Sequence, residues 1–195
     1  MRSRVEGGQV GRLQSMRGLM LALALLASGA AVSRAEPTAE PDGYRMNDYR
    51  SPVPETLKGA KVVNDAAAAK ALTADKRVVF IDVYPRPPKP DNLPPGTVWR
   101  NPPHESIPGS VWLANVGYGV IPPAMEQYFN QRLETLTGAD KARPVVFFCL
   151  RNCWMSWNAA KRALALGYTD VTWFPDGVDA WRELDLPIAN IEPLP

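Results

Sequence analysis

Apolar runs and helical stripes alternate along most of this chain. Short continuous apolar runs are typical of strands buried on both faces, whereas apolar residues spaced three and four apart indicate helices. The runs predict strands at residues 61–63, 78–83, 111–113, 145–148 and 171–174. The stripes predict helices at residues 66–72, 125–136, 157–166 and 178–184. Because strands and helices alternate, we expect one α/β domain with a mostly parallel sheet flanked by helices.

Capping residues support these helix boundaries. Asn64 or Asp65 can cap the first helix, and Ser156 is expected to open the third. Gly138 and Gly167 are expected to end the second and third helices, because glycine readily adopts the left-handed conformation that follows a helix.

Three segments stand outside this alternation. Residues 36–59 are polar and contain several prolines, which predicts an irregular N-terminal arm that packs on the domain. Eight of the nineteen residues from 85 to 103 are proline, so this insertion is expected to be a stiff surface excursion. We expect the domain to span residues 60–190 and residues 191–195 to form a tail.

The N-terminal segment has the pattern of a secretory signal. Residues 16–35 have a basic start, an apolar run and small residues at Ser33 and Ala35, which predicts cleavage before Glu36 and a signal at residues 1–35. The alternative is a membrane anchor, but the apolar run is shorter than the roughly 20 residues that a span requires. We therefore expect export to an oxidising compartment and no stable membrane span after cleavage.

Composition and charge exclude several classes of protein. The chain is 46% hydrophobic and 22% charged, which are ordinary values for a folded protein. Its net charge of +2 becomes −2 without residues 1–35, because 17 basic and 19 acidic residues remain. A nucleic-acid partner is not expected, since the electrostatic support for one is absent.

The two cysteines, Cys149 and Cys153, are the main chemical feature. One close pair cannot form the disulfide framework of a small scaffold, and with His104 as the one histidine the common zinc sets are not available. We expect no metal site and no cofactor. The pair is therefore either reactive or a single local staple.

Cys149 follows the strand at 145–148 and precedes a helix. At this edge of a parallel sheet a thiolate would face free backbone N–H groups and the positive end of the helix dipole, which would lower the pKa of Cys149. The alternative is a small buried apolar residue. Cys153 could be a resolving thiol, half of a disulfide or a second sulfur acceptor.

Residues around the pair are candidates for substrate binding or support. Arg151 is the one cation of the loop and could hold an anion or simply be solvated, while for Trp154 packing is favoured over binding. Asp82 could orient the loop or cap the turn after its strand, Tyr84 could line the mouth of a pocket, and His104 is expected to be solvated. The full set of binding candidates is Leu150, Arg151, Asn152, Trp154, Met155 and Ser156.

At these residues the sequence resembles the rhodanese-like domain family. The Asp-containing strand corresponds to residues 79–83, the Ile-Pro-Gly turn to 107–110, and the strand that delivers the catalytic cysteine to 146–149. The series continues in order through Ala159-Ala160, Leu164, Gly167-Tyr168, Val171 and residues 177–181. The loop departs from the family pattern: it has six residues between Cys149 and Ser156 and no glycine, Tyr84 stands in place of an arginine, and Ser106 in place of a histidine.

The resemblance implies sulfurtransferase-type chemistry through a persulfide on Cys149, with Cys153 as a nearby second thiol. More narrowly, the block from Cys153 to Arg162 resembles the exported PQQ-dependent catabolism-associated CXXCW-motif proteins. That branch implies a periplasmic location, an association with PQQ-dependent alcohol oxidation, and a quinoprotein dehydrogenase or cytochrome c as a partner. The sulfur itself would come from a small sulfane-sulfur donor or pass to a protein thiol acceptor.

Two further functions stay open at this point. The pair could perform thiol–disulfide exchange, or the chain could be a non-catalytic accessory module that uses residues 85–103 as a contact surface. The resemblance does not separate these functions from sulfur transfer.

Overall fold

Five parallel strands form the centre of the fold. The computed structural model describes residues 36–195, and the predicted signal at 1–35 lies outside the described residues. The strand order is β1-β6-β5-β2-β4, all neighbours being parallel. Their bounds are Lys61–Val62 (β1), Val79–Asp82 (β2), Val111–Trp112 (β4), Val145–Phe148 (β5) and Val171–Phe174 (β6).

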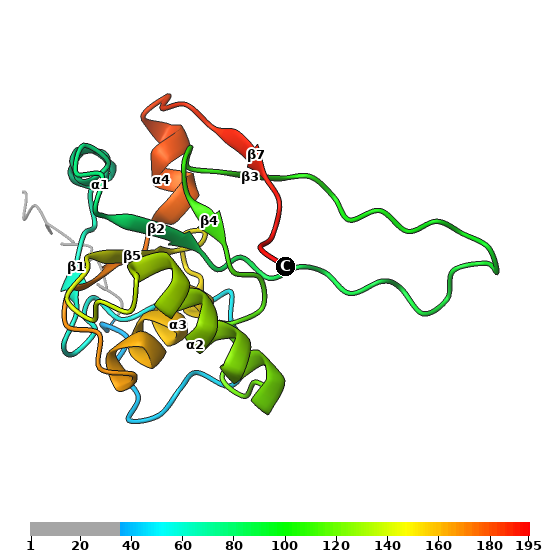
Figure 1. Ribbon diagram of the computed structural model, residues 1–195, viewed down its shortest axis with the longest axis horizontal. Helices are drawn as coiled ribbons and strands as arrows, with labels where there is room; N and C mark the ends of the chain where they lie inside the picture. The colour runs from blue at the N-terminus through cyan, green and yellow to red at the C-terminus, as the bar shows by residue number, and fades with distance from the viewer. Residues whose placement is uncertain (1–35) are drawn as a thin grey trace, which may run out of the picture. The chain divides into compact units, whose positions relative to one another are not determined.

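Helices cover both faces of this sheet (Figure 1). Helices α2 (Pro123–Thr137) and α3 (Trp154–Ala165) cover one face, and α1 (Ala66–Leu72) and α4 (Gly177–Glu183) cover the other. The predicted α/β fold with a mostly parallel sheet is confirmed. The central strand β5 is buried along its whole length, which explains its unbroken apolar sequence.

Helix ends follow the predicted caps except at α3. Asp65 caps α1 by accepting a hydrogen bond from the Ala67 N–H, and Gly138 ends α2 with a φ of 66°. Helix α3 begins at Trp154, with Cys153 as the N-cap, so the prediction that Ser156 opens it is wrong. Ser156 lies inside the first turn, where its hydroxyl donates to the Cys153 carbonyl.

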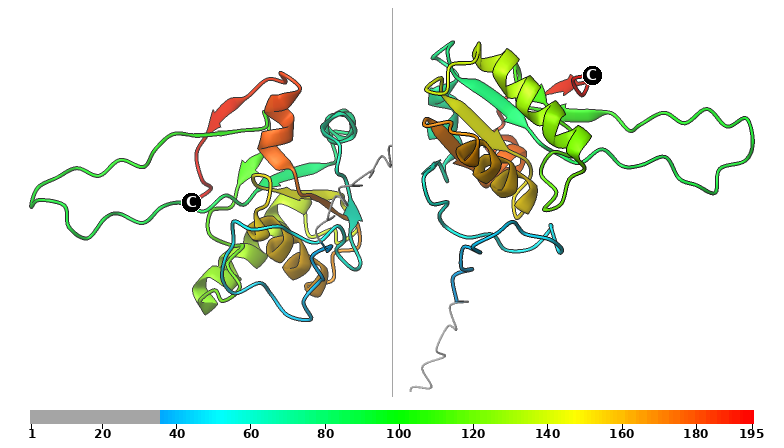
Figure 2. Two further views of the ribbon diagram at one scale, coloured as in Figure 1. Left: turned by 180° about the vertical axis from the view of Figure 1, so that it is seen from behind. Right: turned by 60° about the horizontal axis from the view of Figure 1, so that its bottom comes forward.

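A second small sheet was not predicted. Strand β3 (His104–Ser106) pairs antiparallel with β7 (Ala189–Ile191), and three residues are too few to give a periodic signal. The preceding segment, residues 85–103, contains no helix or strand. Figures 1 and 2 show it as a long loop that extends away from the sheet.

The N-terminal arm, residues 36–59, has no helix or strand and lies along α3 (Figure 2). The buried side chain of Asn158 on α3 holds it: Oδ1 accepts from the Arg45 N–H, and Nδ2 donates to the Arg45 carbonyl, both at 2.9 Å. Near the other end of the chain, the Leu194 N–H donates to the Trp112 carbonyl of β4. Within residues 36–195, no helix is both long and apolar enough for a membrane span.

Gly177 sets how closely α4 approaches the end of β5. Its φ is +48°, and a Cβ at this position would overlap the carbonyl oxygen of Cys149. That carbonyl accepts a hydrogen bond of 2.9 Å from the Val178 N–H. The backbone of Cys149 is therefore held directly by the start of α4.

We predict that Gly177→Ala destabilises the domain far more than Gly138→Ala. Both glycines have positive φ, but Gly138 has open space around it, so its substitution costs only the conformational strain of about 1 kcal/mol. Gly177→Ala adds a clash with backbone and is expected to cost about 3 kcal/mol in the free energy of unfolding. Urea denaturation of the two variants measures the difference, and equal losses would contradict the close approach.

Candidate functional site: two buried thiols at the end of β5

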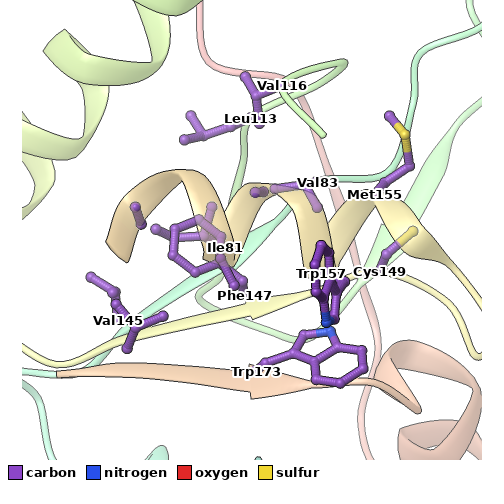
Figure 3. Close-up of a cluster of buried hydrophobic side chains, with 14 of the residues drawn as sticks. Ile81, Val83, Leu113, Val116, Val145, Phe147, Cys149, Met155, Trp157 and Trp173 are labelled. Carbon is purple, nitrogen blue, oxygen red and sulfur yellow. The ribbon is translucent and has the colours of Figure 1, made fainter. Parts of the chain in front are cut away.

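The two cysteines meet where β5 ends and α3 begins. Cys149 directly follows β5, and Cys153 is the N-cap residue of α3. Their sulfur atoms are 2.7 Å apart, both side chains are buried, and the Cys149 thiol donates to Cys153 Sγ. Figure 3 shows Cys149 near Met155 at the edge of the apolar cluster that packs between α3 and the sheet.

Cys149 does not have the lowered pKa that its position predicted. Complete burial raises its pKa well above the ordinary cysteine value, and the neighbouring Cys153 raises it further. The hydrogen bond from the Leu150 N–H acts in the opposite direction without overcoming the burial. The expectation was wrong because α3 begins after Cys153. The backbone N–H groups of its first turn therefore do not stabilise a thiolate on Cys149.

Cys153, and not Cys149, is the cysteine whose pKa is lowered. The hydrogen bond from Cys149 lowers its pKa to about 7, against the opposing effect of burial. The backbone N–H of Met155 and the guanidinium of Arg50 contribute smaller parts of this lowering of the pKa. When the pair loses a proton, the thiolate therefore forms on Cys153 and not on Cys149.

A cavity of about 300 Å³ opens at Cys153. Leu150 of the loop and Met155 of α3 line it, together with Tyr84. The remaining walls come from the N-terminal arm and from two further loops, and they consist of Tyr49, Arg50, Pro85 and Tyr118. Cys149 is not part of this wall.

Three other candidate residues lie elsewhere. The indole N–H of Trp154 donates to Ser51 Oγ and the Pro52 carbonyl, so this side chain anchors the arm. Ser156 is buried and accepts from the indole N–H of Trp173. Asn152 forms the turn of the loop with a φ of +54°.

Arg151 turns toward α4 and away from the thiols. Its guanidinium donates to both carboxylate oxygens of Glu183 at 2.6 and 2.7 Å and to Asp176 at 3.0 Å, and these partners raise its pKa. Its backbone N–H donates to Asp179. Arg151 therefore fixes the loop to both ends of α4, and its charge is already paired.

Asp82 caps the turn after β2, as one of its two predicted roles required. Its Oδ1 accepts from the Tyr84 N–H at 2.8 Å, while Oδ2 accepts from the Ser106 hydroxyl at 2.5 Å and lies 2.8 Å from His104 Nε2. The expectation of a solvated His104 is wrong. Its ring is stacked on Tyr84 with centroids 4.8 Å apart and lies 4.3 Å from the ring of Trp112.

A second cavity of about 610 Å³ adjoins the first. Tyr84 and Leu150 line both cavities, and His104, Trp112 and Arg182 line only the second. This larger cavity lies at the base of the loop at 85–103, whose Pro87 and Pro102 contribute to its wall.

Sequence reasoning missed the residues that come from distant segments. The first cavity includes Tyr49, Arg50 and Tyr118 only because the arm and the loop at 113–121 dock on α3. No local sequence pattern predicts that docking. His104 lies on β3, which pairs with β7 near the other end of the chain, so no local pattern indicated its contact with Asp82. Among residues 36–195, no group of His, Cys, Asp or Glu is arranged to hold a metal ion.

Comparison with known proteins gives a family match. The model of the rhodanese-like domain matches residues 65–184. Similar solved structures include a rhodanese-like domain from Anabaena, with 13% identity, a TM-score of 0.44, and coverage of 69% of this chain and 81% of that one. No curated protein sequence matches the chain.

Two other similar structures have different descriptions. The polysulfide-sulfur transferase homodimer from Wolinella succinogenes has 18% identity, a TM-score of 0.42, and coverage of 67% of this chain and 79% of that one. A protein from Rhodopseudomonas palustris described as a possible tyrosine phosphatase has 21% identity, a TM-score of 0.45, and coverage of 70% and 99%.

We predict that the reduced pair releases its first proton near pH 7 and its second only far above the ordinary cysteine value of about 8.5. Ultraviolet thiolate absorbance against pH measures both steps. In Cys149→Ala the midpoint of Cys153 should rise, because the donor that stabilises its thiolate is lost. In Cys153→Ala the remaining thiol should titrate high, and a midpoint near pH 7 in that variant would contradict the assignment.

Proposed function

The chain belongs to the rhodanese-like domain family, and on this premise we propose that it transfers sulfane sulfur, held as a persulfide on the Cys149–Cys153 pair. The observation that carries the proposal is the contact of 2.7 Å between the two sulfur atoms at the junction of β5 and α3. One thiol of such a pair can accept sulfur and the other can discharge it. The family pattern alone assigns the persulfide to Cys149.

The discharge step balances without an external oxidant. The thiol of the second cysteine attacks the inner sulfur of the persulfide, the bond to the outer sulfur breaks, and that sulfur leaves as hydrogen sulfide with both protons. The two cysteines become a disulfide, so they supply the two electrons that reduce the sulfane sulfur to sulfide. A dithiol reductant must then restore the pair.

The proposal extends to the setting of this chemistry. The signal pattern at residues 16–35 supports export to the periplasm, and the block from Cys153 to Arg162 supports an association with PQQ-dependent alcohol catabolism. A quinoprotein dehydrogenase or a cytochrome c is the partner that this association suggests. The extended loop at 85–103 offers a contact surface for it (Figure 1).

Thiol–disulfide exchange is the second candidate, favoured by the same contact between the sulfurs. Both functions pass through the Cys149–Cys153 disulfide, but only sulfur transfer requires a persulfide. A reduction potential below about −300 mV would mark the disulfide as a structural bridge and would contradict both functions.

We predict that the reduced protein gains about 32 Da per sulfur accepted, or forms the disulfide with release of sulfide, when it is incubated with a sulfane donor without oxygen. Intact-protein mass spectrometry and a sulfide assay measure the two products. The control is the Cys149→Ser/Cys153→Ser double variant, which should show neither. Disulfide formation without any sulfide or adduct would favour exchange over sulfur transfer.

We predict that cell fractionation recovers the protein from the periplasm with Glu36 as its first residue. N-terminal sequencing of the recovered protein identifies the cleavage site. A variant with Leu21→Arg and Leu23→Arg should stay in the cytoplasm, because the charges interrupt the apolar run that export requires. Recovery of the unaltered chain from the cytoplasm at full length would contradict the proposed location.

A further inference from the structure

We infer that Cys153, and not Cys149, takes the sulfur from the donor, and that Arg50 of the N-terminal arm binds the donor's anionic group in place of Arg151. This inference rests on the proposed function and adds to it which thiol reacts first, which cation assists, and which donors fit. It departs from the family pattern, which assigns the first role to the cysteine at the strand end.

Access separates the two thiols. An attacking sulfur must meet the donor's sulfur directly, so it has to line the space that the donor occupies. Both side chains are buried, at 0% exposed for Cys149 and 1% for Cys153, but only Cys153 lines the cavity of about 300 Å³. A donor that enters this cavity therefore reaches Cys153 first.

The hydrogen bond between the thiols gives them complementary roles. Cys149 donates to Cys153, so the accepting sulfur is the one that becomes the thiolate and the donating one stays protonated. The Met155 N–H at the start of α3 adds a second donor to Cys153. Cys153 is thus prepared to attack the donor, and Cys149 retains the proton that leaves with sulfide in the second step.

The cation of the site comes from the arm. Arg151 forms ion pairs with Asp176 and Glu183, so its charge is already neutralised. Arg50 lines the cavity, and among residues 36–195 no ion pair joins it to a carboxylate. The backbone N–H of Trp154 donates at 2.9 Å to the carbonyl of Tyr49, the residue before Arg50. This hydrogen bond fixes that part of the arm at the first turn of α3.

The rest of the wall selects the donor by its chemistry. Besides Arg50 and Cys153, the cavity is lined by three tyrosines, a proline, a leucine and a methionine. One cation among aromatic and apolar groups suits a donor with one negative charge and an apolar body, and not a small inorganic dianion. Organic thiosulfonates have this combination, since the thiosulfonate group carries a single charge beside the organic group.

The transfer step balances for such a donor. The Cys153 thiolate attacks the terminal sulfur of the thiosulfonate, a bond forms between the two sulfurs, and the bond from that sulfur to the sulfonyl sulfur breaks. The electron pair of the broken bond leaves with the sulfinate. The products are the Cys153 persulfide anion and the sulfinate, which together carry the two negative charges of the reactants.

The first test compares Cys149→Ser with Cys153→Ser. Each reduced variant is incubated with benzenethiosulfonate without oxygen, and alkylated peptides are mapped by mass spectrometry. We expect a stable persulfide on Cys153 in Cys149→Ser, because the discharging thiol is missing, and at least about tenfold slower sulfinate release in Cys153→Ser. Thermal unfolding of both variants checks that each is folded.

The outcomes separate the inference from the proposed function. A persulfide on Cys149 in Cys153→Ser, formed as fast as that on Cys153 in the other variant, would overturn the inference and leave sulfur transfer standing. Absence of adduct, sulfide and sulfinate in the unaltered protein as well as in both variants would overturn both.

The second test concerns the cation. We expect Arg50→Gln to slow sulfinate release from benzenethiosulfonate by about tenfold, and Arg50→Lys to restore part of the rate. Arg77→Gln is the matched control, because Arg77 is exposed, paired with Asp75 and placed before β2, at the opposite end of the strands. Added salt should slow the unaltered protein and Arg77→Gln but not Arg50→Gln. Equal rates in Arg50→Gln and Arg77→Gln would overturn the role of Arg50.

Discussion

The side chain of Asn158 joins the three segments on which the site depends. From its place on α3 it makes two hydrogen bonds with the backbone of Arg45 and a third, also of 2.9 Å, with the Gly117 carbonyl. The arm next to Arg45 supplies Tyr49 and Arg50 to the wall of the smaller cavity, the loop after Gly117 supplies Tyr118, and α3 begins at its N-cap residue Cys153. A buried amide needs hydrogen-bond partners for its donors and its acceptor. The side chain of Asn158 therefore fixes the relative positions of the arm, the loop and α3.

Electrostatics divides the same region into two halves. On one side, Asp176 and Glu183 neutralise Arg151 and attach the loop to α4. On the other, Asp82 is buried among the Tyr84 N–H, Ser106 and His104, so its charge is satisfied inside the β2–β4 edge. Neither group pairs with Arg50, which lines the cavity at Cys153.

The parts of the fold that local sequence determines were predicted, and those that depend on distant contacts were not. Residues 145–148 are apolar without interruption because β5 is covered on both faces, and Asp65 and Gly138 mark helix ends by their own conformations. Ser156 was misread as a cap because the choice between it and Cys153 depends on how the loop packs. His104 was misread because its burial depends on β3 pairing with β7, more than 80 residues away in sequence. The cysteine pair was singled out by its spacing and by the strand before Cys149, whereas the assignment of charge within it required the position of the helix terminus.

The arm is synthesised before every other part of residues 36–195, yet its contacts with α3 join positions 113 residues apart. Contacts that close such long loops are entropically costly before the rest of the domain has formed, so the arm is expected to dock late. Until then the cavity at Cys153 lacks the two residues that the arm contributes to its wall, Tyr49 and Arg50. The protected, activated pair is thus a property of the completed domain, and the chemistry of the thiols is coupled to the last stage of folding.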